Sequence, residues 1–148
     1  MPERETLERA REDARAGKSP STQAGEFVRE EMNDIREGKH GARSPQQAIA
    51  IGLSKARRAG VKLGAPKGSA SLRKQAEHDE EASDHPRRKT SKRRSRAIAG
   101  ALEREPHRSA SHQSLSRQAK NAARKRGARA RSQAARKAAP TRRARSSS

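Results

Sequence analysis

Lysine and arginine are the residues of this chain whose number and spacing could do chemistry. Of 148 residues, 37 are Lys or Arg and 17 are Asp or Glu, a formal net charge of +20. From His107 onward there are 13 Lys or Arg residues and no acid. An acid-free basic run of this length binds polyanions, so we expect a nucleic-acid partner, DNA more than RNA. A tail that only keeps the protein soluble is the alternative.

The candidate phosphate-binding residues form three groups along the chain. The first group surrounds an expected helix at 44–59, and at its end Arg57 and Arg58 are explained equally well by the helix dipole. The second is the basic run 87–96, and the third begins at Arg117. The candidate nucleic-acid-binding residues are Lys39, His40, Arg43, Lys55, Arg57, Arg58, Lys62, Arg87, Arg88, Lys89, Lys92, Arg93, Arg94, Arg96, Arg117, Lys120, Arg124, Lys125, Arg126, Arg129, Arg131, Arg136, Lys137, Arg142, Arg143 and Arg145.

Other kinds of site fit this sequence less well. His78, Asp79, Asp84 and His85 could gather around a metal ion, but no apolar framework would hold them. Residues 64–69 resemble a phosphate loop. That motif needs the order Gly-Lys-Ser/Thr, but here Lys67 comes before Gly68. The absence of cysteine excludes disulfides and thiolate catalysis. We therefore expect no catalytic residue, no metal and no cofactor, and not an enzyme.

The segment 38–63 must position the first basic group, because it holds the longest apolar run. Ser44 is a suitable N-cap and Gln47 completes a capping box. Gly60 suits the left-handed position just after the helix. The apolar stripe of this expected helix consists of Ile49, Gly52, Leu53 and Ala56.

Two further helices are expected before this segment. A thin stripe predicts one at 3–16, and a stripe with Phe27 at one edge predicts another at 21–37. The short connection predicts an antiparallel helical hairpin over 21–60. Ile51 lies away from the main stripe, so it is either singly exposed or covered by the first helix or a second copy of the chain.

Composition limits how much of the chain can pack. Only 28% of the residues are apolar, and one is aromatic. High net charge with low hydrophobicity is typical of disorder. We expect a mostly α protein, with a small helical region of two to three helices in residues 1–63. Residues 64–148 are expected to be a largely disordered basic tail rich in Ala, Arg, Ser and Lys, with short nascent helices ending near Gly127 and Pro140.

One stretch resembles a known family. Lys-His-Gly at 39–41, Ser44 and the run Gln47 to Ala56 are similar to the core of a family of small basic bacterial proteins, filed as a domain of unknown function. The resemblance implies a bacterial source, and members are at best labelled DNA-binding. The tail is similar in composition to histone-like basic tails.

These observations favour a nucleoid-associated, histone-like protein that contacts the DNA backbone with little sequence specificity. The alternatives are an RNA- or ribosome-associated protein, and an adaptor that binds a protein through the hairpin. A homodimer through the hairpin is a further option. We expect no membrane partner, because no stretch approaches about 20 apolar residues and the N-terminus lacks the apolar core of a secretory signal. The expected location is the cytoplasmic bacterial nucleoid.

Overall fold

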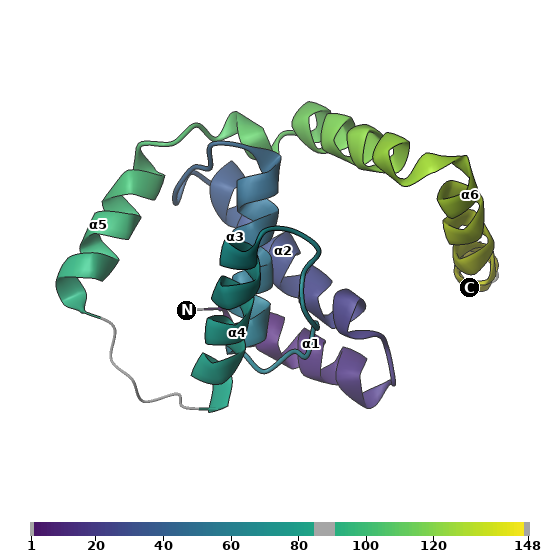
Figure 1. Cartoon of the computed structure of the whole chain (residues 1–148), viewed down its shortest axis with the longest axis horizontal. Helices are drawn as coiled ribbons and strands as arrows, with labels where there is room; N and C mark the ends of the chain where they lie inside the picture. Colours follow the sequence, from purple (N-terminus) through teal and green to yellow (C-terminus); the bar gives the residue numbers. More distant parts are fainter. Residues whose placement is uncertain (1, 85–90, 147–148) are drawn as a thin grey trace. The chain divides into compact units, whose positions relative to one another are not determined.

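The computed structural model describes residues 2–84 and 91–146, and all regular elements in this part of the chain are helical (Figure 1). The chain divides into two units, residues 1–111 and residues 112–148. In chain order, the elements are α1 (Arg4–Arg15), α2 (Pro20–Arg36), α3 (Pro45–Arg58), α4 (Ala70–Asp84), α5 (Lys92–Glu103), the 3₁₀ helix η1 (Arg108–Ala110) and α6 (His112–Ser146).

Helix α2 begins and ends within one residue of the predicted 21–37. The Oγ of Ser19 accepts a hydrogen bond from the backbone N–H of Thr22 at 3.4 Å, and Pro20 takes the first helical position, where its missing N–H costs nothing. After the helix, Gly38 has a φ of 80°, a left-handed conformation that glycine adopts without strain.

Helix α3 has the predicted N-cap. The Oγ of Ser44 accepts a hydrogen bond from the N–H of Gln47 at 3.2 Å. The side chain of Gln47 differs from a standard capping box, because its Oε1 accepts from the N–H of Arg43 at 2.6 Å. Gly60 follows the helix with a φ of 99°, as predicted. Local signals therefore account for both ends of this helix.

The core of the first unit lies where α1, α2 and α3 meet. Phe27 is 1% exposed and lies at its centre, so the prediction that it sits at the edge of the stripe is wrong. Its neighbours are small, which leaves room for the one aromatic ring of the chain. The buried cluster consists of Ala10, Ala24, Phe27, Ala56 and Val61.

Helices α2 and α3 run antiparallel, and a glycine lies at their closest approach. Phe27, in the first half of α2, belongs to the same cluster as Ala56 at the end of α3. Farther along α2, Val28 meets Gly52: a Cβ on Gly52 would lie 2.7 Å from the Cα of Val28. Gly52, the one residue of the α3 stripe without a side chain, thus sets the distance between the two helices.

Helix α4 covers a second face of α3, the face shared by Ile51 and Arg58 at i and i+7. Asp79 on α4 is 1% exposed and accepts hydrogen bonds from Ser54 and from Arg58, the latter at 2.8 Å. The predicted second neighbour of α3 was α1 or another copy of the chain. The structure supplies α4 instead, from the region expected to be disordered.

The segment around η1 also belongs to the first unit, which therefore continues beyond the expected boundary at residue 63. The N–H of Gly41 donates to the carbonyl of Leu102 at 2.8 Å, and the N–H of Ala42 donates to the carbonyl of Pro106 at 3.0 Å. Ala110 is fully buried. We call these two backbone contacts the clasp, because they fasten residues 102–106 to the loop before α3.

The prediction of a largely disordered tail over 64–148 is wrong. Its described residues form α4, α5, η1 and α6. Two physical reasons explain the error. Helix α4 and η1 bury Ala76, Asp79, Ser109 and Ala110, so part of the tail adds to the core. Helix α6 buries nothing, but Ala, Arg, Lys and Gln have the highest intrinsic helix propensities, which the composition argument does not count.

Helix α6 forms the second unit and consists of two segments. Gly127, with a φ of 77° and a ψ of 167°, interrupts the helical geometry, as its predicted role as a stop implies. Pro140, by contrast, lies inside the helix, which continues to Ser146. The two helical segments are therefore residues 112–126 and 128–146.

Candidate nucleic-acid interface

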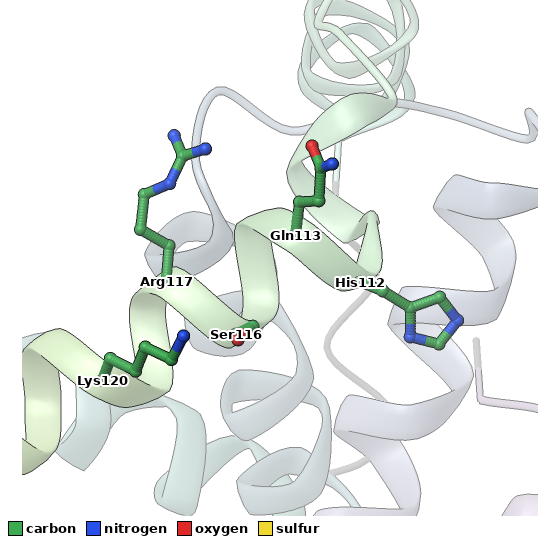
Figure 2. Close-up of a pocket in the computed structure, with 5 residues that line it drawn as sticks. All are labelled: His112, Gln113, Ser116, Arg117 and Lys120. Atoms are coloured by element: carbon green, nitrogen blue, oxygen red, sulfur yellow. The ribbon is translucent and has the colours of Figure 1, made fainter.

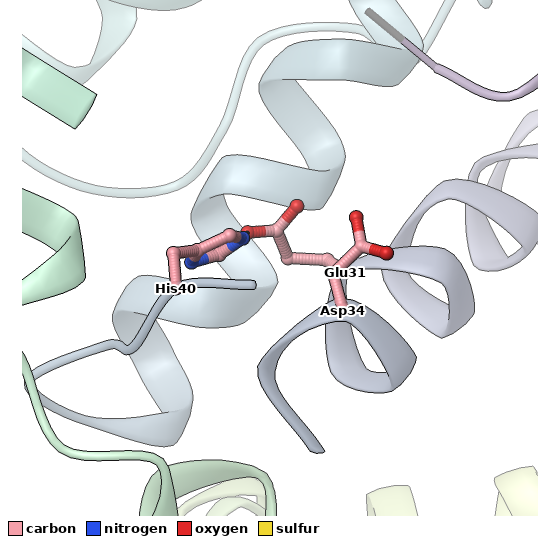
Figure 3. Close-up of side chains that lie close together, drawn as sticks. All are labelled: Glu31, Asp34 and His40. Atoms are coloured by element: carbon pink, nitrogen blue, oxygen red, sulfur yellow. The ribbon is translucent and has the colours of Figure 1, made fainter. Parts of the chain in front are cut away.

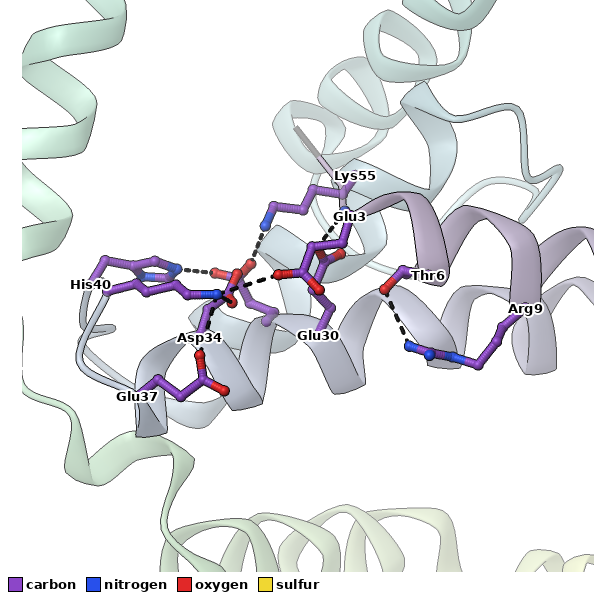
Figure 4. Close-up of polar contacts among 10 residues, drawn as sticks. Glu3, Thr6, Arg9, Glu30, Asp34, Glu37, His40 and Lys55 are labelled. Carbon is purple, nitrogen blue, oxygen red and sulfur yellow. Dashed lines mark hydrogen bonds and ion pairs between the residues drawn. The ribbon is translucent and has the colours of Figure 1, made fainter.

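The predicted basic residues between positions 39 and 58 are all paired with carboxylates of the first unit. Lys39 is the clearest case: its Nζ lies 2.8 Å from Asp34, 3.3 Å from Glu37 and 3.4 Å from Glu3. Figure 4 labels these three acids. The hydrogen bond to Asp34, followed by the one to Glu37, raises the pKa of the Lys39 ammonium above its ordinary value. These three carboxylates, one before α1 and two at the end of α2, hold the ammonium group in place.

A buried carboxylate holds two more of the predicted residues. Glu31 on α2 is 1% exposed, and the Nε2 of His40 lies 2.9 Å from its Oε1. The Nζ of Lys55, which extends from α3, lies 2.6 Å from its Oε2. Removing Lys55 would leave a buried charge without compensation, so its charge belongs first to the fold.

The two arginines at the end of α3 point to α4. Arg58 pairs with the buried Asp79, and Arg57, whose side chain is 10% exposed, lies 3.9 Å from Glu80. These acids, and not the helix dipole alone, explain the positive charge at this helix end. Arg43 lies 3.6 Å from Glu105.

Lys62 differs from the rest of this first group. It is exposed, and it makes no ion pair with another residue that the structure describes. Of the seven candidates between residues 39 and 62, it is therefore the one whose charge remains available to a partner.

Helix α5 presents four of the predicted cations. They are exposed and form no ion pair within the described ranges 2–84 and 91–146. The helix buries no residue. Three further candidates, Arg87, Arg88 and Lys89, lie outside the described residues. The four cations of α5 are Lys92, Arg93, Arg94 and Arg96.

Helix α6 carries the remaining twelve candidates, and all of them are exposed. The helix contains no acidic residue, so no carboxylate within it can neutralise them. Five lie on the first segment and seven on the second. They are Arg117, Lys120, Arg124, Lys125, Arg126, Arg129, Arg131, Arg136, Lys137, Arg142, Arg143 and Arg145.

Part of the first segment is ordered into a stripe. Arg117, Lys120 and Arg124 are spaced i, i+3 and i+7, which places them on one helix face. Figure 2 shows Arg117 and Lys120 beside Ser116, at a shallow pocket that this helix lines by itself. A pocket formed by one exposed helix face cannot enclose a small molecule. The helix face that forms it can lie against an extended charged surface.

The density of charge on α6 can be compared with that of a duplex. At 1.5 Å per residue, the segments 112–126 and 128–146 are about 22 and 28 Å long, so each carries roughly one cation per 4 Å. Duplex DNA has one phosphate charge per about 1.7 Å of its axis. A helix of this density can thus neutralise a large part of the phosphates that it follows.

Sequence reasoning located the cations but missed their partners. Glu31 and Asp79 are the two buried acids that hold the first group. Asp79 was considered as a metal ligand, and the structure pairs it with Arg58. Nothing in the helical pattern indicated that Glu31 is buried.

No family model matches the chain, and no curated protein or solved structure matches it either. Among the described residues, no helix combines the length and the apolar composition needed to cross a membrane.

Proposed function

We propose that this protein binds nucleic acid through phosphate contacts made mainly by α6, with DNA preferred over RNA and with little sequence specificity. It acts without catalysis, as a nucleoid-associated, histone-like protein of the bacterial cytoplasm. The observation that carries this proposal is the division of the cations: those of residues 39–58 are paired internally, whereas α6 has twelve exposed cations and no acid.

The division matters because binding needs charge that is available. A paired cation must first lose its carboxylate, and for Lys55 that leaves Glu31 buried and unpaired. A cation such as Arg117 on α6 exchanges only water and small anions for phosphate, and the condensed counterions released from the nucleic acid favour association. Lys62 and the four cations of α5 can add to the contact surface.

The proposal is tested by measuring duplex DNA binding of the full chain as a function of salt, using fluorescence anisotropy of a labelled duplex. Neutralisation of about 8 phosphates gives a slope of log K against log salt near −7. The stripe variant carries Arg117→Gln, Lys120→Gln and Arg124→Gln. Glutamine keeps the helix propensity and removes three charges, so the slope becomes shallower by about 3.

The matched control changes three exposed cations of the first unit, Arg11→Gln, Arg15→Gln and Arg29→Gln. It removes the same net charge from α1 and α2. If α6 makes the contacts, the control keeps a slope close to that of the unaltered chain. An equal loss in both variants would show that only the total charge matters, and a shallow slope in the unaltered chain would contradict the proposal as a whole.

The same protein and labelled duplex can test the two alternative functions. An RNA- or ribosome-associated role predicts that structured RNA displaces the labelled duplex more effectively than unlabelled duplex does. An adaptor role predicts a partner complex insensitive to salt. The α2–α3 hairpin, on which both the adaptor role and a homodimer would depend, packs against α1, α4 and η1 in the first unit. This leaves less of its surface for a partner.

A further inference from the structure

Three side chains that can bind metal lie together at the end of α2. Glu31, Asp34 and His40 each offer one ligand atom, and these atoms all lie within 4.8 Å of one another (Figure 3). The side chains are 1%, 14% and 18% exposed, respectively. Glu31 and Asp34 are three residues apart on one helix face, and His40 follows in the loop.

The histidine is oriented by a contact outside this cluster. Its Nδ1 lies 3.0 Å from the carbonyl oxygen of Gly41. A carbonyl oxygen only accepts, so the ring donates through Nδ1, and Nε2 is the nitrogen that faces the cluster. This is the backbone contact that typically fixes the tautomer of a metal-binding histidine. The Nε2 lies 2.9 Å from the Oε1 of Glu31, so the two atoms can face the same ion.

The buried carboxylate of Glu31 is the second feature of this cluster that suits a bound cation. Both oxygens of Glu31 are buried, and neither accepts a hydrogen bond from any described group, although the Nζ of Lys55 is only 2.6 Å away. The ligand atoms of a tetrahedral ion with bonds of about 2.1 Å are about 3.4 Å apart. This value lies between the 2.9 Å from Nε2 to Oε1 and the 4.8 Å within which all three ligand atoms lie.

The surrounding charge also favours a divalent ion. The connected contacts join four carboxylates to two ammonium groups, an excess of two negative charges. Lys39 forms an ion pair with Asp34, and its 49% exposed side chain also contacts Glu3 and Glu37. It can therefore leave Asp34 and retain the ion pairs with the other two acids. The carboxylates are Glu3, Glu31, Asp34 and Glu37, and the ammonium groups are Lys39 and Lys55.

We propose that Glu31, Asp34 and His40 bind a divalent first-row transition-metal ion, Zn²⁺ foremost. An imidazole nitrogen beside two carboxylates suits Zn²⁺ and its neighbours, whereas Mg²⁺ and Ca²⁺ prefer oxygen ligands alone. The bound ion ties the loop at 38–43 to α2. That loop carries Gly41, whose N–H forms one contact of the clasp, so the ion also strengthens the attachment of residues 102–106.

The test is a calorimetric titration of the full chain with Zn²⁺, with Co²⁺ as an optical probe of the ligand field. We expect one tight ion per chain and weaker binding of Mg²⁺. His40→Gln lowers the Zn²⁺ affinity at least about tenfold. The matched control is His78→Gln, whose side chain is 67% exposed on α4 and which leaves the affinity unchanged.

A second pair of variants guards against a loss of folding. Asp34→Asn removes a ligand charge with no change in size and weakens binding, whereas Lys39→Met removes the competitor of Asp34 and strengthens it. Far-UV circular dichroism confirms that each variant keeps its helices. The proposal is overturned if Zn²⁺ binds equally to the unaltered chain and to His40→Gln, if Mg²⁺ binds as tightly, or if no ion binds.

Discussion

Gly41→Ala tests the least expected feature of the fold, the clasp between the loop at 38–43 and residues 102–106. A Cβ at position 41 would lie 1.8 Å from the carbonyl oxygen of Glu105 and 2.8 Å from that of Pro106. Both atoms belong to the backbone, so no side-chain rotation relieves the overlap. Residues 105 and 106 must move away from the loop.

The cost of that movement follows from what the clasp holds. The hydrogen bonds from Gly41 to Leu102 and from Ala42 to Pro106 are lost, at about 1 kcal/mol each. Ala42 and Ala110, both fully buried, become partly exposed, at up to about 0.8 kcal/mol for each methyl group. The expected loss in the free energy of unfolding is therefore about 3 kcal/mol.

Urea denaturation followed by far-UV circular dichroism measures this loss, since the chain has no Trp or Tyr for intrinsic fluorescence. The matched control is Gly25→Ala, an exposed position inside α2 where a Cβ meets nothing within 4 Å. It should stabilise the protein by about 0.5–1 kcal/mol. Limited trypsin digestion adds a local readout, with faster cleavage after Arg104 in Gly41→Ala. An unchanged urea midpoint together with unchanged cleavage would refute the clasp.

Two further predictions concern α3. Gly52→Ala places a Cβ 2.7 Å from the Cα of Val28. It should lower the free energy of unfolding by about 1–2 kcal/mol, after the gain in helix propensity is subtracted. A urea midpoint equal to or above that of the unaltered chain would contradict this packing. Lys55→Met leaves Glu31 buried without its ammonium partner and should cost about 3 kcal/mol, whereas the control Lys62→Met, at an exposed position, should cost almost nothing.

Short-range structure could be predicted from the sequence because its causes are local. The predicted helix 21–37 agrees with α2 to within one residue at each end, where Ser19, Pro20 and Gly38 provide local start and stop signals. Ser44 and Gly60 did the same for α3. The long-range structure could not be predicted in this way. The clasp joins backbone groups of Gly41 and Leu102, which carry no side-chain signal and lie far apart in the sequence.

The candidate site was predicted by composition, and composition does not say which cations are free. Lys55 and Lys62 look alike in sequence, but only Lys55 lies across the helix pair from a buried acid. That difference depends on the register of α2 against α3, which Gly52 and Val28 set by contact. The error about the tail has a related origin, since the capacity to bury apolar surface was counted and intrinsic helix propensity was not.

The two classes of cation imply that stability and binding can be altered separately. The ion pairs of Lys55 and Arg58 hold elements of the first unit together, so their charge is already balanced. Arg117, Lys120 and Arg124 on α6 make no ion pair with a residue that the structure describes, so their charge is balanced by solution anions or by phosphate. Neutralising Arg117, Lys120 and Arg124 should therefore flatten the salt dependence of DNA binding and leave the urea midpoint of the first unit unchanged. Lys55→Met should lower the urea midpoint and leave the salt dependence of DNA binding unchanged, when binding is measured under conditions in which the variant is folded. If each variant changed both quantities, the cations would form a single class, and the assignment of binding to α6 would lose its basis.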